Sequence, residues 1–163
     1  MRGMEIPDDV TTKGRMMDCG ADDRPPEVRE LFTYLCVRGA AAAIEFYSRV
    51  FGARERFRWA DPERGRIGHA ELELGPAVLM LADEHPERGI LSPLAYGGTG
   101  TTLHLHVDDV DALTRRAADA GATVLRPPAD EGHGERQSRI RDPFGHEWLI
   151  GGPLAGDEPT TNP

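Results

Sequence analysis

The sequence predicts an α+β fold made of two copies of a βαβββ module, and an internal recurrence is the main observation behind this prediction. Two stretches of the chain follow the same order of one strand, one amphipathic helix and three further strands. Val37, which closes the first strand, recurs 70 residues later as Val107, and Gly52, which ends the first helix, recurs 69 residues later as Gly121. Repetition at a nearly constant spacing indicates that one supersecondary unit has been duplicated.

The first module, at about 31–84, begins with the apolar segment LFTYLCV at 31–37, which is typical of a strand. A helix opens at 38–41, and Gly52 suits its carboxyl end because glycine tolerates a positive φ. The apolar residues of this helix recur with a period of 3.6 and form one buried stripe, namely Ala43, Ile44, Tyr47, Val50 and Phe51. Alternating polarity then predicts three more strands, at 53–59, 66–74 and 77–82.

The second module, at about 101–152, follows a connector rich in Gly and Pro and opens with a strand at 102–107. Asp108 is the expected N-cap of the next helix, because a carboxylate accepts the free backbone N–H groups there. The expected buried stripe of this helix is Val110, Leu113, Ala117 and Ala120. A strand at 122–125 leads into 127–134, which we interpret as an ordinary surface loop or, given its Gly content, a mobile lid.

The module ends in a hairpin at 139–150 whose turn is Asp-Pro-Phe-Gly, with proline and glycine at positions that suit a β-turn. Alternation along the last strand places Trp148 and Ile150 on the face that packs on the helix, and Glu147 and Leu149 on the opposite face. His146 lies in the turn, where we expect it to be solvated, as we do for His85 and His133 in other loops.

Composition restricts the class of protein. The chain of 163 residues carries a formal net charge of −9, and the acidic balance argues against nucleic acid and anionic membranes as partners. No segment is apolar enough for a signal peptide or a membrane span, and with only two cysteines a reducing cytoplasm fits. We expect one domain at 29–152, a flexible N-terminal arm at 1–28 and a C-terminal tail at 153–163. The arm could alternatively dock on the core or on a second subunit.

Two such modules placed side by side are expected to curl their sheets into a partly open barrel, with one sheet face covered by the helix and the other facing a shared cavity. Alternation along each strand groups residues two apart on one face of the sheet. A strand pair such as His104 and His106 holds its two imidazoles about 7 Å apart on one face.

Four segments carry a resemblance to a known family: AAIEFYSRVFGA (42–53), GHAELELGPAVLMLADE (68–84), LHLHVDDVDALTRRAADAGATVLRPP (103–128) and RDPFGHEWLI (141–150). Their order, spacing and duplication resemble the vicinal oxygen chelate superfamily, which includes glyoxalase I, bleomycin- and fosfomycin-resistance proteins, methylmalonyl-CoA epimerase and extradiol dioxygenases. The resemblance is strongest to the glyoxalase/bleomycin-resistance-like branch, and it implies that branch's two-module fold.

The metal-dependent members of this superfamily hold a divalent cation with His or Glu from four cavity-facing positions. The resemblance carries these positions onto Phe32, Met80, Thr102 and Leu149. The strand phase that places these four in the cavity also places Tyr34, His69, His104, His106 and Glu147 there. Together with Trp59, which could stack on a planar ligand, these are the candidate ligand-binding residues. None of the four is a ligand that a divalent site of this kind uses. We therefore predict no metal and no cofactor. The alternative is a relocated metal among His69, His104, His106 and Glu147, and a merely polar lining is the other interpretation of those residues.

The resemblance leaves two function classes open. The first is a metal-independent protein that binds an antibiotic or metabolite, with apolar contacts from the cavity and hydrogen bonds from its His and Glu side chains. In the bleomycin-resistance type two chains pair, so the resemblance implies a homodimer. The second is an enzyme, either a lyase or isomerase with a relocated metal, or one that uses His104 or His106 with Glu147 as an acid–base pair. A regulatory protein with a vestigial pocket is a further alternative.

Overall fold

The computed structural model describes residues 27–132 and 134–154. The chain divides into two compact units, Met1–Glu30 and Leu31–Pro163. Most of the expected N-terminal arm and of the expected C-terminal tail, together with His133, lies outside the described residues. The second unit contains all the helices and strands of the described residues.

The first module contains one helix and four strands in the predicted order. Its elements are β1 (Thr33–Val37), α1 (Ala40–Phe51), β2 (Arg54–Ala60), β3 (Ile67–Leu74) and β4 (Ala77–Asp83). The strands form one sheet in the order β1-β4-β3-β2, in which β1 runs parallel to β4 and the other pairs are antiparallel. We call it sheet 1. Gly52 ends α1 with a φ of 71°, as expected for a left-handed carboxyl cap.

The second module repeats this plan. Its elements are β5 (Thr102–His106), α3 (Val110–Asp119), β6 (Thr123–Asp130), β7 (Glu135–Arg141) and β8 (Glu147–Pro153). Its strands form sheet 2 in the order β5-β8-β7-β6, which is the order of sheet 1 four strands later. The connector between the modules is not irregular throughout, because it holds a 3₁₀ turn, η1 (Pro86–Arg88), and a short helix, α2 (Pro93–Tyr96).

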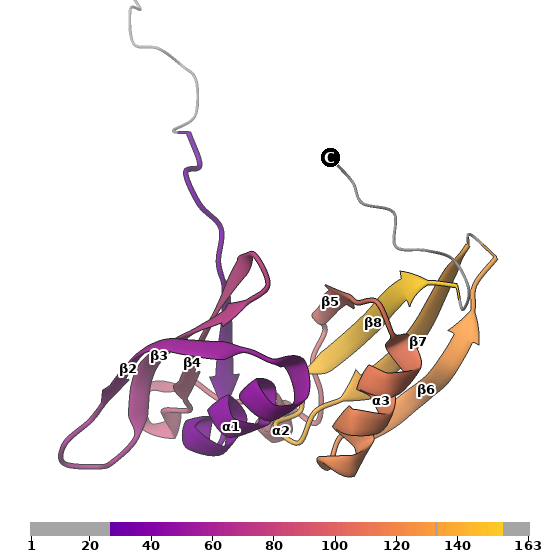
Figure 1. The fold of residues 1–163 in the computed structure, drawn as a ribbon. Helices are drawn as coiled ribbons and strands as arrows, with labels where there is room; N and C mark the ends of the chain where they lie inside the picture. The colour runs from indigo at the N-terminus through magenta and orange to yellow at the C-terminus, as the bar shows by residue number, and fades with distance from the viewer. Residues whose placement is uncertain (1–26, 133, 155–163) are drawn as a thin grey trace, which may run out of the picture. The chain divides into compact units, whose positions relative to one another are not determined.

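The predicted α+β fold and its duplication are confirmed. Each module is a separate four-stranded sheet, and the described strands do not close into a barrel. In Figure 1, α1 lies on one face of sheet 1 and α3 on one face of sheet 2, which agrees with their contacts. The other face of each sheet carries no helix of its own module, and we call it the open face. No helix of the described residues is both long and apolar enough to cross a membrane.

The helix start in module two differs from the prediction. The N-cap is Asp109, not Asp108: its backbone is extended, and its carboxylate accepts the backbone N–H of Ala112 at 2.8 Å. Val110 is buried, and the shift places it in the first helical turn against the core. Both aspartates are chemically able to cap, so the sequence alone does not decide between them.

The first half of the expected loop at 127–134 is strand. β6 continues to Asp130, with a bulge between Arg126 and Ala129 that takes up the two prolines. Prolines are tolerated because β6 is at the edge of its sheet, where a missing backbone donor costs no ladder hydrogen bond. At the other end of the chain, β8 extends to Pro153, past the predicted limit of the hairpin.

His146 also differs from the prediction. It is buried rather than solvated, and its Nε2 lies 3.1 Å from the backbone oxygen of Cys36. Because Cys36 belongs to β1 and His146 to the β7–β8 turn, this contact links the two modules. The turn is therefore part of the protein interior, which its polar sequence does not suggest.

One buried carboxylate lies at the centre of the joint between the modules. Asp142 is 3% exposed, and its Oδ2 accepts the hydroxyl of Tyr47 at 2.7 Å and the indole N–H of Trp148 at 2.9 Å. Its Oδ1 accepts the backbone N–H groups of Phe144 and His146, both at 2.9 Å. Burial and the adjacent Asp142 raise the pKa of Tyr47 well above its usual value, so this hydroxyl remains a donor.

The aromatic rings around this carboxylate form the core of the joint. Tyr47 and Phe51 of α1 stack with their rings 11° apart, and the Phe51 and Trp148 ring centres lie 4.7 Å apart. Such contacts contribute about 1 kcal/mol each beyond the area they bury. Helix α1 of module one thus packs directly on β8 of module two, and the two modules share one core.

We predict that Tyr47→Phe lowers the free energy of unfolding by about 1–2 kcal/mol, because the Asp142 carboxylate loses one buried donor. Asp142→Ala is expected to cost about 4 kcal/mol, since it leaves several buried donors without an acceptor. Urea unfolding followed by circular dichroism measures both changes. Asp119→Ala, on the exposed side of α3, is the control. Equal, small losses in all three variants would contradict the central place of Asp142.

Candidate functional site

The open face of sheet 1 is lined by large, partly exposed side chains. We call it the aromatic face, and its members are Tyr34, Phe57, Trp59, His69 and Met80. Tyr34, Phe57 and Trp59 are 52%, 50% and 53% exposed. On the opposite face of the same strands, Ala70, Leu72 and Leu81 are fully buried. An exposed aromatic surface of this kind is typical of a site that binds a ligand or a partner.

Trp59 is positioned by a glycine on the neighbouring strand. Trp59 pairs with His69 across β2 and β3, and its ring covers Gly68 so closely that a Cβ there would lie 2.3 Å from a ring carbon. Gly68 is the residue that lets the indole lie against the sheet. About half of Trp59 remains exposed, so the indole is accessible to a stacking ligand.

Three polar side chains of the aromatic face form a chain. The hydroxyl of Tyr34 lies 3.0 Å from Nδ1 of His69, and Nε2 of His69 lies 3.3 Å from Oε1 of Glu71. Partial burial, followed by the electrostatic effect of the neighbouring Cys36, raises the pKa of Tyr34. The chain orients His69 and places a hydroxyl donor at the centre of the face. Tyr34 and His69 were expected in the cavity. The contact between His69 and Glu71 makes the Glu71 carboxylate part of the same site.

The open face of sheet 2 holds the other expected residues. Thr102, His104 and His106 alternate outward along β5, and Glu147 and Leu149 lie beside them on β8. Trp148 and Ile150 point into the core, so the predicted phase of the last strand is confirmed. A cavity of about 660 Å³ opens on this face and is lined by Thr102, Leu125, Arg126, Arg139, Glu147 and Leu149. We call it the arginine pocket.

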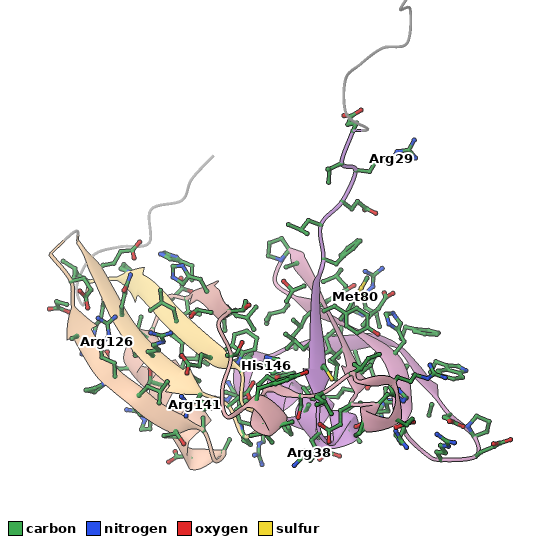
Figure 2. All side chains as sticks on the ribbon, turned by 180° about the vertical axis from the view of Figure 1, so that it is seen from behind. Arg29, Arg38, Met80, Arg126, Arg141 and His146 are labelled. Carbon is green, nitrogen blue, oxygen red and sulfur yellow. The ribbon has the colours of Figure 1, made fainter. Side chains whose placement is uncertain are left out.

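Glu147 is held in the arginine pocket by two guanidinium groups. Its Oε2 lies 2.7 Å from Nη2 of Arg139, and its Oε1 lies 2.7 Å from Nη2 of Arg141. The hydrogen bond from Arg141 and the charges of both arginines lower the pKa of Glu147, although burial opposes the shift. The carboxylate is therefore ionised and its oxygens are already engaged. Figure 2 shows Arg126 and Arg141 on sheet 2 and Met80 on sheet 1.

The histidines of β5 lie apart from this carboxylate. His106 has Glu135 as its acidic neighbour, at 3.7 Å, and the rings of His104 and His106 lie 6.3 Å apart. The ring of His104 lies against Gly151, where a Cβ would be 2.7 Å from Nε2. Glu147 itself is bound by arginines. The expected pair of His104 or His106 with Glu147 is thus not assembled in this structure.

The residues at the four inherited ligand positions do not fit a divalent cation. Phe32 precedes β1, Met80 lies on β4, and Thr102 and Leu149 line the arginine pocket, so the four supply no imidazole and no carboxylate. The relocated set is divided as well: His69 belongs to sheet 1, and His104, His106 and Glu147 belong to sheet 2. Within 27–132 and 134–154, no three His, Cys, Asp or Glu side chains are grouped closely enough to hold a metal ion.

The structure adds residues that the sequence did not single out: Phe57, Arg126, Arg139 and Arg141. Arg139 and Arg141 flank the core-facing Ile140 on one strand, and this alternation was a visible signal, because strand residues two apart share a face. Phe57 carried no clear signal. A bulge in β2 between Glu55 and Phe57 changes the phase of that strand.

Comparison with known proteins agrees with this architecture. A model of the Glyoxalase/Bleomycin resistance protein/Dioxygenase superfamily matches residues 30–150. The protein belongs to this superfamily. Its members generally bind small molecules and often form dimers.

The similar proteins do not assign a defined activity to this member of the superfamily. An uncharacterized Mycobacterium tuberculosis protein, Rv0887c, is 41% identical over 127 residues, which cover 76% of this chain and 74% of that protein. The structure of TioX from Micromonospora sp. ML1 has a TM-score of 0.58 and 28% identity, covering 80% of this chain and 100% of TioX. The Arabidopsis thaliana At5g48480 product has a TM-score of 0.62 and 26% identity, covering 76% and 98%.

We predict that Gly68→Ala displaces the Trp59 ring from the sheet and shifts its fluorescence emission to longer wavelength. A Cβ at this position overlaps the ring. Because the ring is exposed and can move, the free energy of unfolding is expected to fall by only about 1 kcal/mol. Gly100→Ala, at a site with open space around it, is the control. Identical emission spectra in the two variants would contradict the placement of Trp59.

We also predict that Glu147→Gln reduces the acid sensitivity of the fold. The folded pKa of Glu147 lies below its ordinary 4.5, so the stabilisation from its ion pairs is complete above that value and is lost as the pH falls through the folded pKa. Urea unfolding at pH values from neutral to below 4.5 measures the loss. The variant should be less stable than wild type at neutral pH and should lose less on acidification. Glu63→Gln, an exposed turn residue, should follow the wild type throughout.

Proposed function

We propose that this protein binds a small antibiotic- or metabolite-type molecule without a metal ion. The observation that carries the proposal is the arginine pocket: a cavity of about 660 Å³ in which two inherited ligand positions hold Thr102 and Leu149. Its volume is in the range that drug-sized ligands occupy. Apolar side chains supply contact area, and a few polar groups fix the orientation of the ligand, as in most small-molecule sites.

The proposal includes a homodimer in which the aromatic face of one chain covers the arginine pocket of the other. Support comes from the half-exposed rings of Tyr34, Phe57 and Trp59 on a sheet face that no helix of module one covers. Exposed apolar edges and faces of sheets invite association with another chain. The superfamily often forms dimers. In such a pair the ligand would lie between stacking rings and polar groups, and each pocket would be complete only in the dimer.

The acidic composition favours a small molecule over nucleic acid or an anionic membrane as the partner, since the net charge is −9. Cys36 forms no disulfide within the part of the chain that the structure describes. Burial and the nearby Glu84 raise its pKa, so it remains protonated and unreactive. The low cysteine content, two residues in the whole chain, supports a reducing, cytoplasmic compartment as the place where the protein works.

An acid–base enzyme is the second candidate, and the chain from Tyr34 through His69 to Glu71 is the observation that favours it. Glu71 orients His69, and His69 can take a proton from the Tyr34 hydroxyl or return one to it. The hydroxyl lies on the open face, where a ligand bound against the aromatic rings would meet it. The enzyme would bind the same ligand and then alter it chemically. Recovery of unchanged ligand therefore favours the binding protein over the enzyme.

Binding is tested by isothermal calorimetry of the full chain against a panel of aromatic antibiotics and metabolites, with bound compounds recovered and analysed by mass spectrometry. We expect one site per chain, unchanged ligand, and affinity that a chelator does not alter. Trp59→Ala should weaken binding about tenfold or more, because a central aromatic contact is removed. Tyr96→Ala, an exposed ring on α2 outside both open faces, is the control.

Sedimentation analysis of the same samples tests the pairing of two chains. A monomer at every protein concentration would overturn the dimer, and affinity that a chelator abolishes would overturn metal independence. A chemically altered ligand would select the enzyme candidate. Loss of that reaction in His69→Gln, with binding retained, would assign it to the chain from Tyr34 to Glu71.

A further inference from the structure

Three arginines gather on one face of sheet 2. Arg126 and Arg139 are direct cross-strand partners on β6 and β7, and Arg141 lies two residues after Arg139 on the same face. Cβ atoms of such partners are about 5 Å apart, and like charges directly opposite each other destabilise a sheet. A cluster of this kind needs negative charge nearby.

The protein supplies only part of that negative charge. Glu147 is shared between Arg139 and Arg141, and Glu131 accepts from Nη1 of Arg126 at 2.6 Å. Among the residues that line the pocket, the two guanidinium groups of Arg126 and Arg139 and the one carboxylate of Glu147 leave one net positive charge. Glu135 lies further along the face, beside His106, and does not line the pocket. The surplus is notable because the whole chain has a formal charge of −9.

Hydrogen-bond donors are also in excess. The side chains of Arg139 and Arg141 are 45% and 41% exposed, and both use Nη2 to hold Glu147. Nε of Arg141 is buried and has no hydrogen-bond partner. A guanidinium carries five N–H donors in a plane that matches a carboxylate. The hydroxyl of Thr102, 3.0 Å from Nη2 of Arg139, adds a further polar group beside the arginines.

From this surplus of charge and donors we infer that the arginine pocket recognises an acidic group, and that the ligand is a planar monoanion such as an aromatic carboxylate. The inference rests on the proposed function and names its ligand class. One net positive charge matches a carboxylate or sulfonate better than a phosphate dianion. Leu125 and Leu149 line the same cavity and contact the apolar part of the ligand. Arg139 is the central recognition residue, because it contacts both Glu147 and Thr102.

A matched pair of fluorescent dyes tests the assignment. 8-Anilinonaphthalene-1-sulfonate and N-phenyl-1-naphthylamine share one aromatic skeleton, and only the first carries an acidic group. We expect the anionic dye to bind the wild-type protein more tightly than the neutral one. Arg139→Gln should weaken the anionic dye about tenfold, since one charge-assisted contact is lost, and should leave the neutral dye unchanged. Arg141 continues to neutralise Glu147 in this variant, so the fold is retained, and circular dichroism verifies this.

Arg115→Gln is the control, because Arg115 lies on α3, which covers the opposite face of sheet 2. It removes the same charge from the protein and should leave both affinities unchanged. If Arg115→Gln and Arg139→Gln weaken binding of the anionic dye equally, the net charge of the protein explains the loss, and the acidic-group subsite at Arg139 is overturned. Equal binding of both dyes, unaffected by Arg139→Gln, would overturn the acidic-group assignment while the proposed binding function stands. Failure of both dyes to bind would overturn the proposed function and the subsite together.

Competition separates the kinds of anion. Sodium benzoate is expected to displace the anionic dye from the wild type at an ionic strength where inorganic phosphate does not. Displacement by phosphate at lower concentration than benzoate would overturn the assignment to a planar monoanion. Loss of benzoate competition in Arg139→Gln, with the neutral dye still bound, would place the carboxylate beside that residue.

Discussion

The buried carboxylate of Asp142 accepts four hydrogen bonds, and the relation between the two modules depends on them. Its donors come from α1, from β8 and from the backbone of the β7–β8 turn, so a single side chain joins the helix of one module to the hairpin of the other. An unpaired charge at this depth would be strongly destabilising, and the complete set of donors is what makes its burial tolerable. The turn is therefore a structural element of the core.

The same contacts fix the phase of the last strand. Because the indole of Trp148 donates to Asp142 and packs on Phe51, Trp148 must face the core. Successive strand residues point to opposite faces, so Glu147 and Leu149 must face the open side. Glu147 then meets the arginines of β7, and the pocket on sheet 2 depends on an interaction on the opposite face of the sheet.

The two open faces differ in chemistry although the modules share one plan. The first carries rings and the chain from Tyr34 to Glu71, whereas the second carries arginines around a single carboxylate. The four positions at which the resemblance predicts metal ligands, Phe32, Met80, Thr102 and Leu149, hold apolar or hydroxyl side chains. Recognition in the proposed site thus rests on stacking and on hydrogen bonds from guanidinium groups, which suit a flat organic ligand with an acidic group.

The sequence by itself determined the duplication, the order of elements and the faces of the main strands. These features arise from hydrophobic period and glycine placement, which act locally, and Gly52 and Trp148 behave as their patterns indicate. Tertiary structure alone decided the features that depend on contacts between distant segments. The burial of His146, the continuation of β6 past two prolines, and the partners of Glu147 depend on packing between elements. Alternation could place Glu147 on a face, but only the paired strands decide that arginines, and not histidines, surround it.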